Sequence, residues 1–172
     1  MAWSPDGSKI AYRVVSLASH THDIAVMNAT GNVCGDTGCG WTYWRSSYPG
    51  ADSAPSWSPD GAQLVFNRYA AGLKHVLRVS GPLSTPIELT PGITSFAETP
   101  AWSPDGRLII FALSGLTDDL WTMSELDGSG LTQATPFDFS YMPDWQELNT
   151  PASPTPETVT TGSVAIPFAS VS

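Results

Sequence analysis

The chain has 172 residues, of which 41% are hydrophobic and 10% aromatic, so it is long enough to bury one sizeable core. Its net charge of −9, with only 7 Lys and Arg, speaks against binding nucleic acid and against docking on anionic membranes. No apolar stretch approaches the roughly 20 residues of a membrane span, and 15 Gly and 15 Pro fit a turn-rich β protein.

A repeated phrase, Trp-Ser-Pro-Asp-Gly, divides the chain. Its three copies begin at Trp3, Trp57 and Trp102, and each leads into an apolar run typical of a β-strand. A fourth, incomplete copy is Met142-Pro143-Asp144-Trp145. A repeat length of about 45 residues indicates a solenoid, a propeller or a repeat array.

The Ser-Pro-Asp-Gly part of the phrase predicts a tight turn between two antiparallel strands. Pro presets the first corner of a type I turn, Ser and Asp cap backbone N–H groups, and Gly takes the following left-handed position. Each Trp ends the first strand, where a large ring suits packing between neighbouring sheets. We therefore assign a structural role, not a catalytic one, to Trp3, Asp6, Gly7, Trp57, Asp60, Gly61, Trp102, Asp105 and Gly106.

In the first repeat, residues 9–14 and 23–28 are predicted strands, joined by a polar link at 19–22. His20, His22 and Asp23 lie close together in that sequence. A solvated loop is favoured over a metal site there, because the residues sit in a polar link before a strand. No metal and no cofactor is expected.

A loop with two cysteines makes the first repeat about ten residues longer than the others. The four residues between Cys34 and Cys39 include two Gly and allow a local disulfide, which would imply an oxidising compartment. Two free thiols are the alternative, and a zinc site would need further ligands that are not near in sequence.

The densest aromatic group follows this loop. Residues 41–45 alternate like an outer strand, and the candidate binding residues are Trp41, Tyr43, Trp44 and Tyr48. Such a group on a β surface can stack on sugars or grip a peptide. The alternative is that these rings cover the outer edge of the sheet and pack on the long loop.

The second and third repeats follow the same order of strands. We predict strands at 63–68, 74–79 and 86–90, then at 108–113, 118–123 and 131–135, and a new inner strand at 139–145. His75 lies in the middle of a strand, where packing is favoured over metal ligation. From residue 149 onwards a Pro/Thr/Ser tract favours extended, unpacked backbone.

Several motif pieces recur in register and resemble the TolB-like β-propeller repeat. In the third repeat they are Trp102–Gly106, Asp119–Met123, Asp127–Gly130 and Leu131–Thr132, and in the first repeat Asp23–Asn28 matches as well. The resemblance covers about 145 residues. It implies four-stranded blades around a central channel, with Asp at the start of the third strand as part of the pattern.

We therefore expect an all-β β-propeller of about three four-stranded antiparallel blades over residues 1–148, followed by a linker or tail at 149–172. The predicted blades are 2–55, 56–100 and 101–145. Three blades should not close a ring alone, so either the chain is part of a longer propeller, which we favour, or two chains pair into six blades. No signal peptide is expected, because the first residues already belong to a repeat.

The resemblance implies a non-enzymatic scaffold that binds a protein or peptide in the periplasm or outside the cell, since the TolB-like family works with the Tol–Pal envelope system. Self-association through open blade edges is a further expected contact. The alternatives are the gating propeller of a prolyl-oligopeptidase-type serine peptidase and a secreted carbohydrate-binding module. No catalytic residue is assigned, because the sequence has no Gly-x-Ser-x-Gly, no His-Glu-x-x-His and no phosphate-binding Gly loop.

Overall fold

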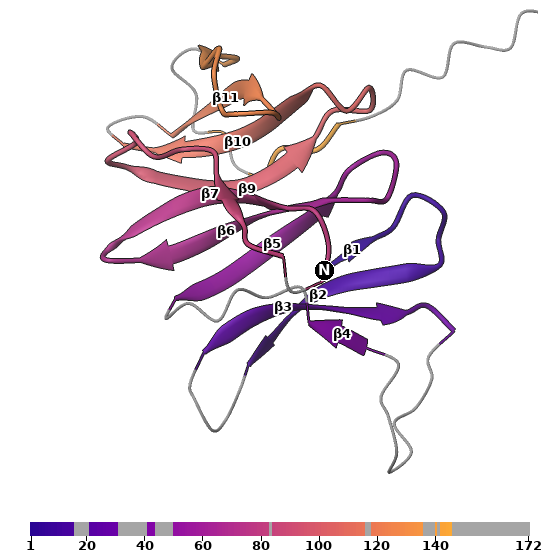
Figure 1. Cartoon of the computed structure of the whole chain (residues 1–172). Coiled ribbons are helices and arrows are strands. Elements are labelled where there is room, and N and C mark those ends of the chain that lie inside the picture. Colours follow the sequence, from indigo (N-terminus) through magenta and orange to yellow (C-terminus); the bar gives the residue numbers. More distant parts are fainter. Residues whose placement is uncertain are drawn as a thin grey trace, which may run out of the picture.

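The computed structural model describes residues 1–15, 21–30, 41–43, 50–82, 84–115, 118–135, 140 and 142–145. Within these ranges the chain forms twelve β-strands and no helix. The strands make three consecutive meanders of four strands each, which lie side by side in chain order (Figure 1). We call the meanders blades 1, 2 and 3. The predicted all-β propeller of three four-stranded blades is confirmed, and the sheets do not close into a ring.

Each blade runs from a short or bulged inner strand to a short outer one. Blade 1 contains β1 (Ala2–Trp3), β2 (Lys9–Val15), β3 (His22–Asn28) and β4 (Trp41–Tyr43). Blade 2 contains β5 (Ala51–Trp57), β6 (Leu64–Ala70), β7 (Leu73–Val79) and β8 (Ile87–Glu88). Blade 3 contains β9 (Phe96–Trp102), β10 (Leu108–Ser114), β11 (Asp119–Ser124) and β12 (Thr132–Gln133). The middle strands agree with the predicted ranges to within two residues, and the outer strands β8 and β12 are shorter than predicted.

The three Ser-Pro-Asp-Gly turns share one geometry. In each, the Gly N–H donates to the Ser carbonyl at 2.9 Å, and the Gly φ lies between 69° and 72°. The Ser hydroxyl donates to the Asp carboxylate at 2.6 Å and accepts the N–H of the residue five positions later. The Ser hydrogen bond, with a backbone N–H as a further donor, lowers the pKa of all three Asp carboxyls, that of Asp6 to about 2.

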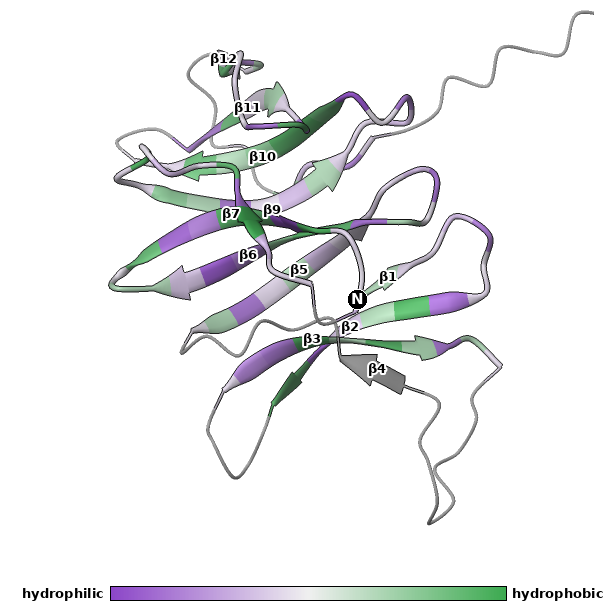
Figure 2. Cartoon of the chain, in the orientation of Figure 1, coloured by the Kyte–Doolittle hydropathy of each residue, from purple (hydrophilic) through white to green (hydrophobic). Residues whose placement is uncertain are grey.

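Blade 2 is buried on both faces, because it lies between blades 1 and 3. Successive side chains of its strands point to opposite sides and therefore enter two different cores. Between blades 1 and 2 lies a core of Ala11, Ile24, Val26, Trp57, Leu64, Phe66, Leu77 and Val79. Between blades 2 and 3 lies a second core of Val65, Val76, Leu89, Ala97, Trp102, Ile109, Phe111 and Met123. Figure 2 shows the same pattern, with hydrophobic residues in middle strands such as β10 and hydrophilic ones at the turns.

The repeated Trp residues pack against the preceding blade. The side chains of Trp57 and Trp102 are each only 6% exposed, and the indole Nε1 of Trp57 donates to the Ala2 carbonyl of blade 1 at 3.2 Å. Trp3 occupies the same register position opposite Ile10 but is 59% exposed. The expected packing between sheets therefore holds for two rings and is wrong for Trp3, because no blade covers that side of blade 1 in the described chain.

The structure corrects the reading of the polar link before β3. His22 and Asp23 belong to β3, and Asp23 is buried, so a solvated loop is wrong for these two residues. His20 lies outside the described residues. His75 lies in β7 with its side chain partly buried, and its Nδ1 lies 2.9 Å from Glu88 Oε1, because β8 runs directly beside β7.

The predicted inner strand at 139–145 is not formed by its described residues. Ser140 and Met142–Trp145 are not in a strand. An inner strand needs the ladder of the second strand in its own blade, and no Pro-Asp-Gly turn follows Trp145 to provide one. The cysteine pair and the tail at 149–172 lie outside the described residues.

Candidate functional site

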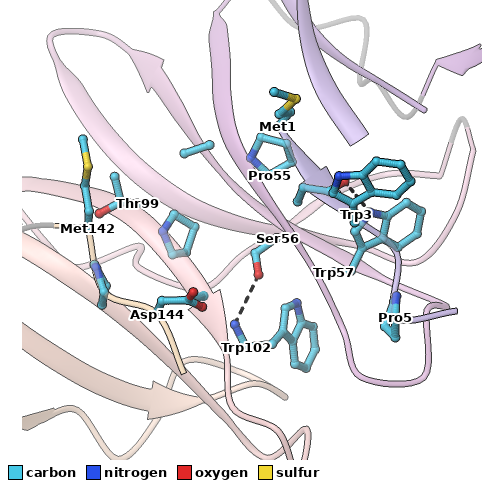
Figure 3. Close-up of a pocket in the computed structure, with 15 residues that line it drawn as sticks. Met1, Trp3, Pro5, Pro55, Ser56, Trp57, Thr99, Trp102, Met142 and Asp144 are labelled. Atoms are coloured by element: carbon cyan, nitrogen blue, oxygen red, sulfur yellow. Dashed lines mark hydrogen bonds between the residues drawn. The ribbon is translucent and has the colours of Figure 1, made fainter. Parts of the chain in front are cut away.

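A hollow of about 570 Å³ runs along the inner strands of all three blades (Figure 3). Residues from β1, β5, β9 and the segment around Pro143 line it: Met1, Ala2, Trp3, Pro5, Ala54, Pro55, Ser56, Trp57, Thr99, Pro100, Ala101, Trp102, Met142, Pro143 and Asp144. The inner strands of a propeller surround its channel. The hollow is therefore the channel face of the three-blade arc.

A left-handed residue followed by Pro recurs along this face. Pro55, Pro100 and Pro143 each stand two residues before a repeat Trp. The residue before each Pro is not Gly, yet has a left-handed φ: 49° at Ala54, 47° at Thr99 and 54° at Met142. Such backbone is uncommon for L-residues and is kept only where the surroundings fix it. In β5 and β9 it coincides with a shift in the ladder register, a β-bulge.

The bulge and the Pro keep the channel face from pairing with another strand. Strand β9 is the edge of its sheet, and β5 has, apart from its ladder with β6, only one parallel bridge to β3, between Ala51 and His22. Strand edges invite further pairing unless bulges or Pro interrupt them. Pro also lacks the N–H that a ladder would need. The repeated left-handed residue and Pro therefore disfavour β-strand pairing along the inner strands, and the hollow stays open to a ligand.

Most residues around the hollow have apolar side chains, with Ser56, Thr99 and Asp144 as the polar members, but the surface that faces the hollow is more polar than apolar. Met1 and Met142 are both largely exposed, and flexible thioether side chains adapt well to different partners. Asp144 is the one titratable side chain of this lining. A lining of this kind can hold a ligand by contacts with apolar side chains and by hydrogen bonds to main-chain groups.

Polar contacts elsewhere lie within blade 2 and between blades 2 and 3. Within blade 2, Arg68 of β6 donates two hydrogen bonds to Asp52 of β5, at 2.6 and 2.7 Å, and both side chains are buried. Burial raises the pKa of the Asp52 carboxyl against the opposing effect of Arg68. Between blades 2 and 3, Lys74 pairs with Glu98, and Arg78 contacts Glu125 at 2.7 Å. In the described part of the chain no group of three or more His, Cys, Asp or Glu is placed to hold a metal ion.

Two residues of the predicted aromatic binding group, Trp41 and Tyr43, belong to β4 at the other edge of blade 1. Strand β4 pairs with β3, whereas β1 borders the hollow. Trp44 and Tyr48 lie outside the described residues, and so do the side chains of Trp41 and Tyr43. The hollow was not predicted from the sequence. The feature of the sequence that could have indicated it is the Pro that recurs two residues before the Trp at 57, 102 and 145.

The fold is that of known propeller structures. The chain matches a putative TolB from Agrobacterium tumefaciens with 23% identity and a TM-score of 0.68, over 84% of this chain and 52% of that one. It matches TolB from Acinetobacter baumannii with 25% identity and a TM-score of 0.57, over 78% and 31%. It also matches prolyl oligopeptidase B from Galerina marginata with 18% identity and a TM-score of 0.50, over 81% and 22%. The chain thus spans about half the length of the Agrobacterium protein and less of the others.

No protein-family model and no curated protein sequence matches the chain. The described part of the chain contains no helix that is both long and apolar enough to cross a membrane. The solved structures that share the fold include both TolB proteins and peptidases. Function must therefore be argued from the site.

Proposed function

We propose, from its TolB-like β-propeller fold, that this chain is a non-enzymatic scaffold that binds an extended peptide or protein segment along its inner strands. We place it in an extracytoplasmic compartment, as the likeness to TolB implies for this chain. The proposal concerns the three blades and the hollow that they share.

The observation that carries the proposal is the hollow itself. Its volume of about 570 Å³ lies within the range of pockets that hold small ligands or a few residues of a peptide. Its surface is more polar than apolar and combines apolar side chains with polar groups, and an extended peptide offers a similar mixture of apolar side chains and backbone polar groups. The exposed Met1 and Met142 add adaptable apolar surface at its rim.

A peptide library tests this proposal. Peptides selected on the purified chain are titrated against the wild type, the M142K variant and the L126K variant. Both substitutions replace a well-exposed apolar side chain, 79% exposed for Met142 and 67% for Leu126, so both variants should fold. Only Met142 borders the hollow. We expect M142K to weaken binding at least about tenfold, equivalent to about 1.4 kcal/mol, and L126K to leave it unchanged.

Unchanged affinity in M142K would overturn the inner-strand site. A loss of binding in Trp44→Ala instead would move the site to the aromatic group after the cysteine loop. The carbohydrate-binding alternative predicts that glycans, and not peptides, bind there.

The likeness to a prolyl oligopeptidase supports one alternative, a propeller that serves a peptidase. A gating propeller would not cleave peptides by itself, so a separate assay asks whether the chain is catalytic: the selected peptides are incubated with it and examined by mass spectrometry. A non-enzymatic scaffold returns them intact. Time-dependent cleavage by the purified chain, at a rate proportional to its concentration, would contradict the proposal.

A further inference from the structure

One exposed carboxylate borders the hollow. Asp144 lies directly before Trp145 and is among the residues that line the hollow. Its Oδ1 accepts the Trp145 N–H at 2.9 Å, and its Oδ2 has no hydrogen bond to any described residue. Figure 3 shows the Asp144 side chain on the same side of the hollow as Met142 and Thr99. The hollow therefore offers a charged acceptor atom to a ligand.

Hydrogen-bond donors are scarce around the hollow. Four of its described lining residues are prolines, which keep a carbonyl oxygen but have no backbone N–H: Pro5, Pro55, Pro100 and Pro143. The described lining contains no Lys, Arg, His, Asn or Gln. The Trp57 indole already donates to a carbonyl of blade 1, and the Thr99 hydroxyl and the Trp102 indole nitrogen are enclosed. The side-chain donors left are the Ser56 hydroxyl and the Trp3 indole.

The described chain supplies no basic side chain to this carboxylate. Arg68, Lys74 and Arg78 already pair with carboxylates of blades 2 and 3, and the other described basic side chains do not line the hollow. The whole chain has a net charge of −9, so its field attracts cations and repels anions. Asp144 is thus an acceptor that a cation from a ligand can pair with.

We propose that the partner segment places a basic side chain, arginine or lysine, in the hollow against Asp144. This inference rests on the proposed function and names the chemistry that the site selects. Both side chains carry several donors and no acceptor, so they match a lining that is rich in acceptors. The charged head pairs with Oδ2 of Asp144, and the methylene stem packs on the apolar side chains of Met142 and Pro143.

Neutral isosteres in the peptide test this inference. The peptides selected on the chain are synthesised with acetylated amino termini, so that no terminal ammonium contributes to binding. In a second set each arginine is replaced by citrulline and each lysine by acetyl-lysine, which keep the shape and remove the charge. We expect every tightly bound peptide to contain a basic residue, and its neutral isostere to bind at least about fivefold more weakly.

Two variants of the chain locate the contact. Asp144→Asn removes the proposed partner of the basic side chain. Asp105→Asn removes a carboxylate that is 60% exposed and lies outside the hollow, so both variants have the same net charge. In Asp144→Asn the basic peptide and its neutral isostere should bind within about twofold of each other, whereas in Asp105→Asn the fivefold difference should remain.

Failure of this inference and failure of the proposed function give different results. Peptides that depend on Met142 for binding but lack a basic residue, or bind equally well as the neutral isostere, would overturn the basic side chain and leave the inner-strand site in place. A difference between peptide and isostere that survives Asp144→Asn would also overturn the inference. Peptides whose affinity is the same for M142K and the wild type would overturn the proposed function and this inference with it.

Discussion

One added methyl group at Gly128 should strongly destabilise the fold, because blades 2 and 3 approach each other closely there. Gly128 lies in the turn between β11 and β12, with a φ of 74°. A Cβ built there would lie 1.8 Å from the carbonyl oxygen of Leu89, while real Cβ contacts stay beyond 3.0 Å. Because Leu89 is buried in the core between the blades, Gly128→Ala must push the two blades apart at their outer edges.

Two effects add up in that variant. A left-handed φ at a residue with a Cβ costs about 1–2 kcal/mol, and forcing a carbon into a packed contact costs a further 1–3 kcal/mol or so. Gly130→Ala is the matched control, because Gly130 has a φ of 69° in the same turn and its Cβ would meet no atom within 4 Å. We expect Gly128→Ala to lower the free energy of unfolding by about 2–5 kcal/mol and Gly130→Ala by about 1–2 kcal/mol.

Urea unfolding followed by tryptophan fluorescence measures both variants. The difference between them isolates the contact with Leu89, because the backbone effect is common to both. Equal losses in the two variants would refute the close approach of blades 2 and 3 at this point.

Three further predictions concern the blade contacts and the turns. Trp57→Phe removes the hydrogen bond to Ala2 and should lower the free energy of unfolding by about 0.5–1.5 kcal/mol more than Trp102→Phe does. The reason is that the Trp102 indole nitrogen is buried with no partner among the described residues. Equal losses of stability in urea unfolding would contradict this. Arg68→Met leaves Asp52 buried without its charge partner and should lower the free energy of unfolding by about 3–5 kcal/mol. Much of that stability should return when Asp52 is also made apolar. If the double variant is no more stable than Arg68→Met, the unpaired charge is not the cause. The pKa of Asp6 is about 2 instead of 3.8, so its contribution to stability is present above about pH 4 and is lost as the pH falls towards 2; Asp6→Asn should flatten the acid unfolding curve in that window, and an unchanged curve would speak against it.

Local features of this fold could be predicted from the sequence. The Ser-Pro-Asp-Gly turns were predictable because Pro, Asp and Gly fix the backbone within four residues. The middle strands were predictable because apolar runs such as Leu108–Ser114 stand directly after those turns. The outer strands were predictable in position. Thr90 and Thr135 end the predicted outer strands at 86–90 and 131–135, and their hydroxyl groups accept hydrogen bonds from the N–H groups of Val76 and Leu120.

Features that join distant residues could not be predicted in the same way. Asp52 and Arg68 meet because β5 and β6 pair, and each residue alone looks like an ordinary surface charge. Trp3 and Trp57 have the same sequence context, and only the position of a neighbouring blade makes one exposed and the other buried. The hollow arises where three inner strands converge, and the recurring Pro signals it only once the bulge geometry is known.

The methyl spectrum of the four methionines tests the proposed function most directly. Met1 and Met142 border the hollow, Met123 is buried between blades 2 and 3, and Met27 lies on the face of blade 1 that points away from blade 2. A peptide selected on the chain is titrated into protein labelled with ¹³C at the methionine methyl groups. We predict that the Met142 and Met1 signals shift in proportion to occupancy while those of Met27 and Met123 stay in place. Saturable binding that leaves the Met142 signal unmoved would contradict a site on the inner strands.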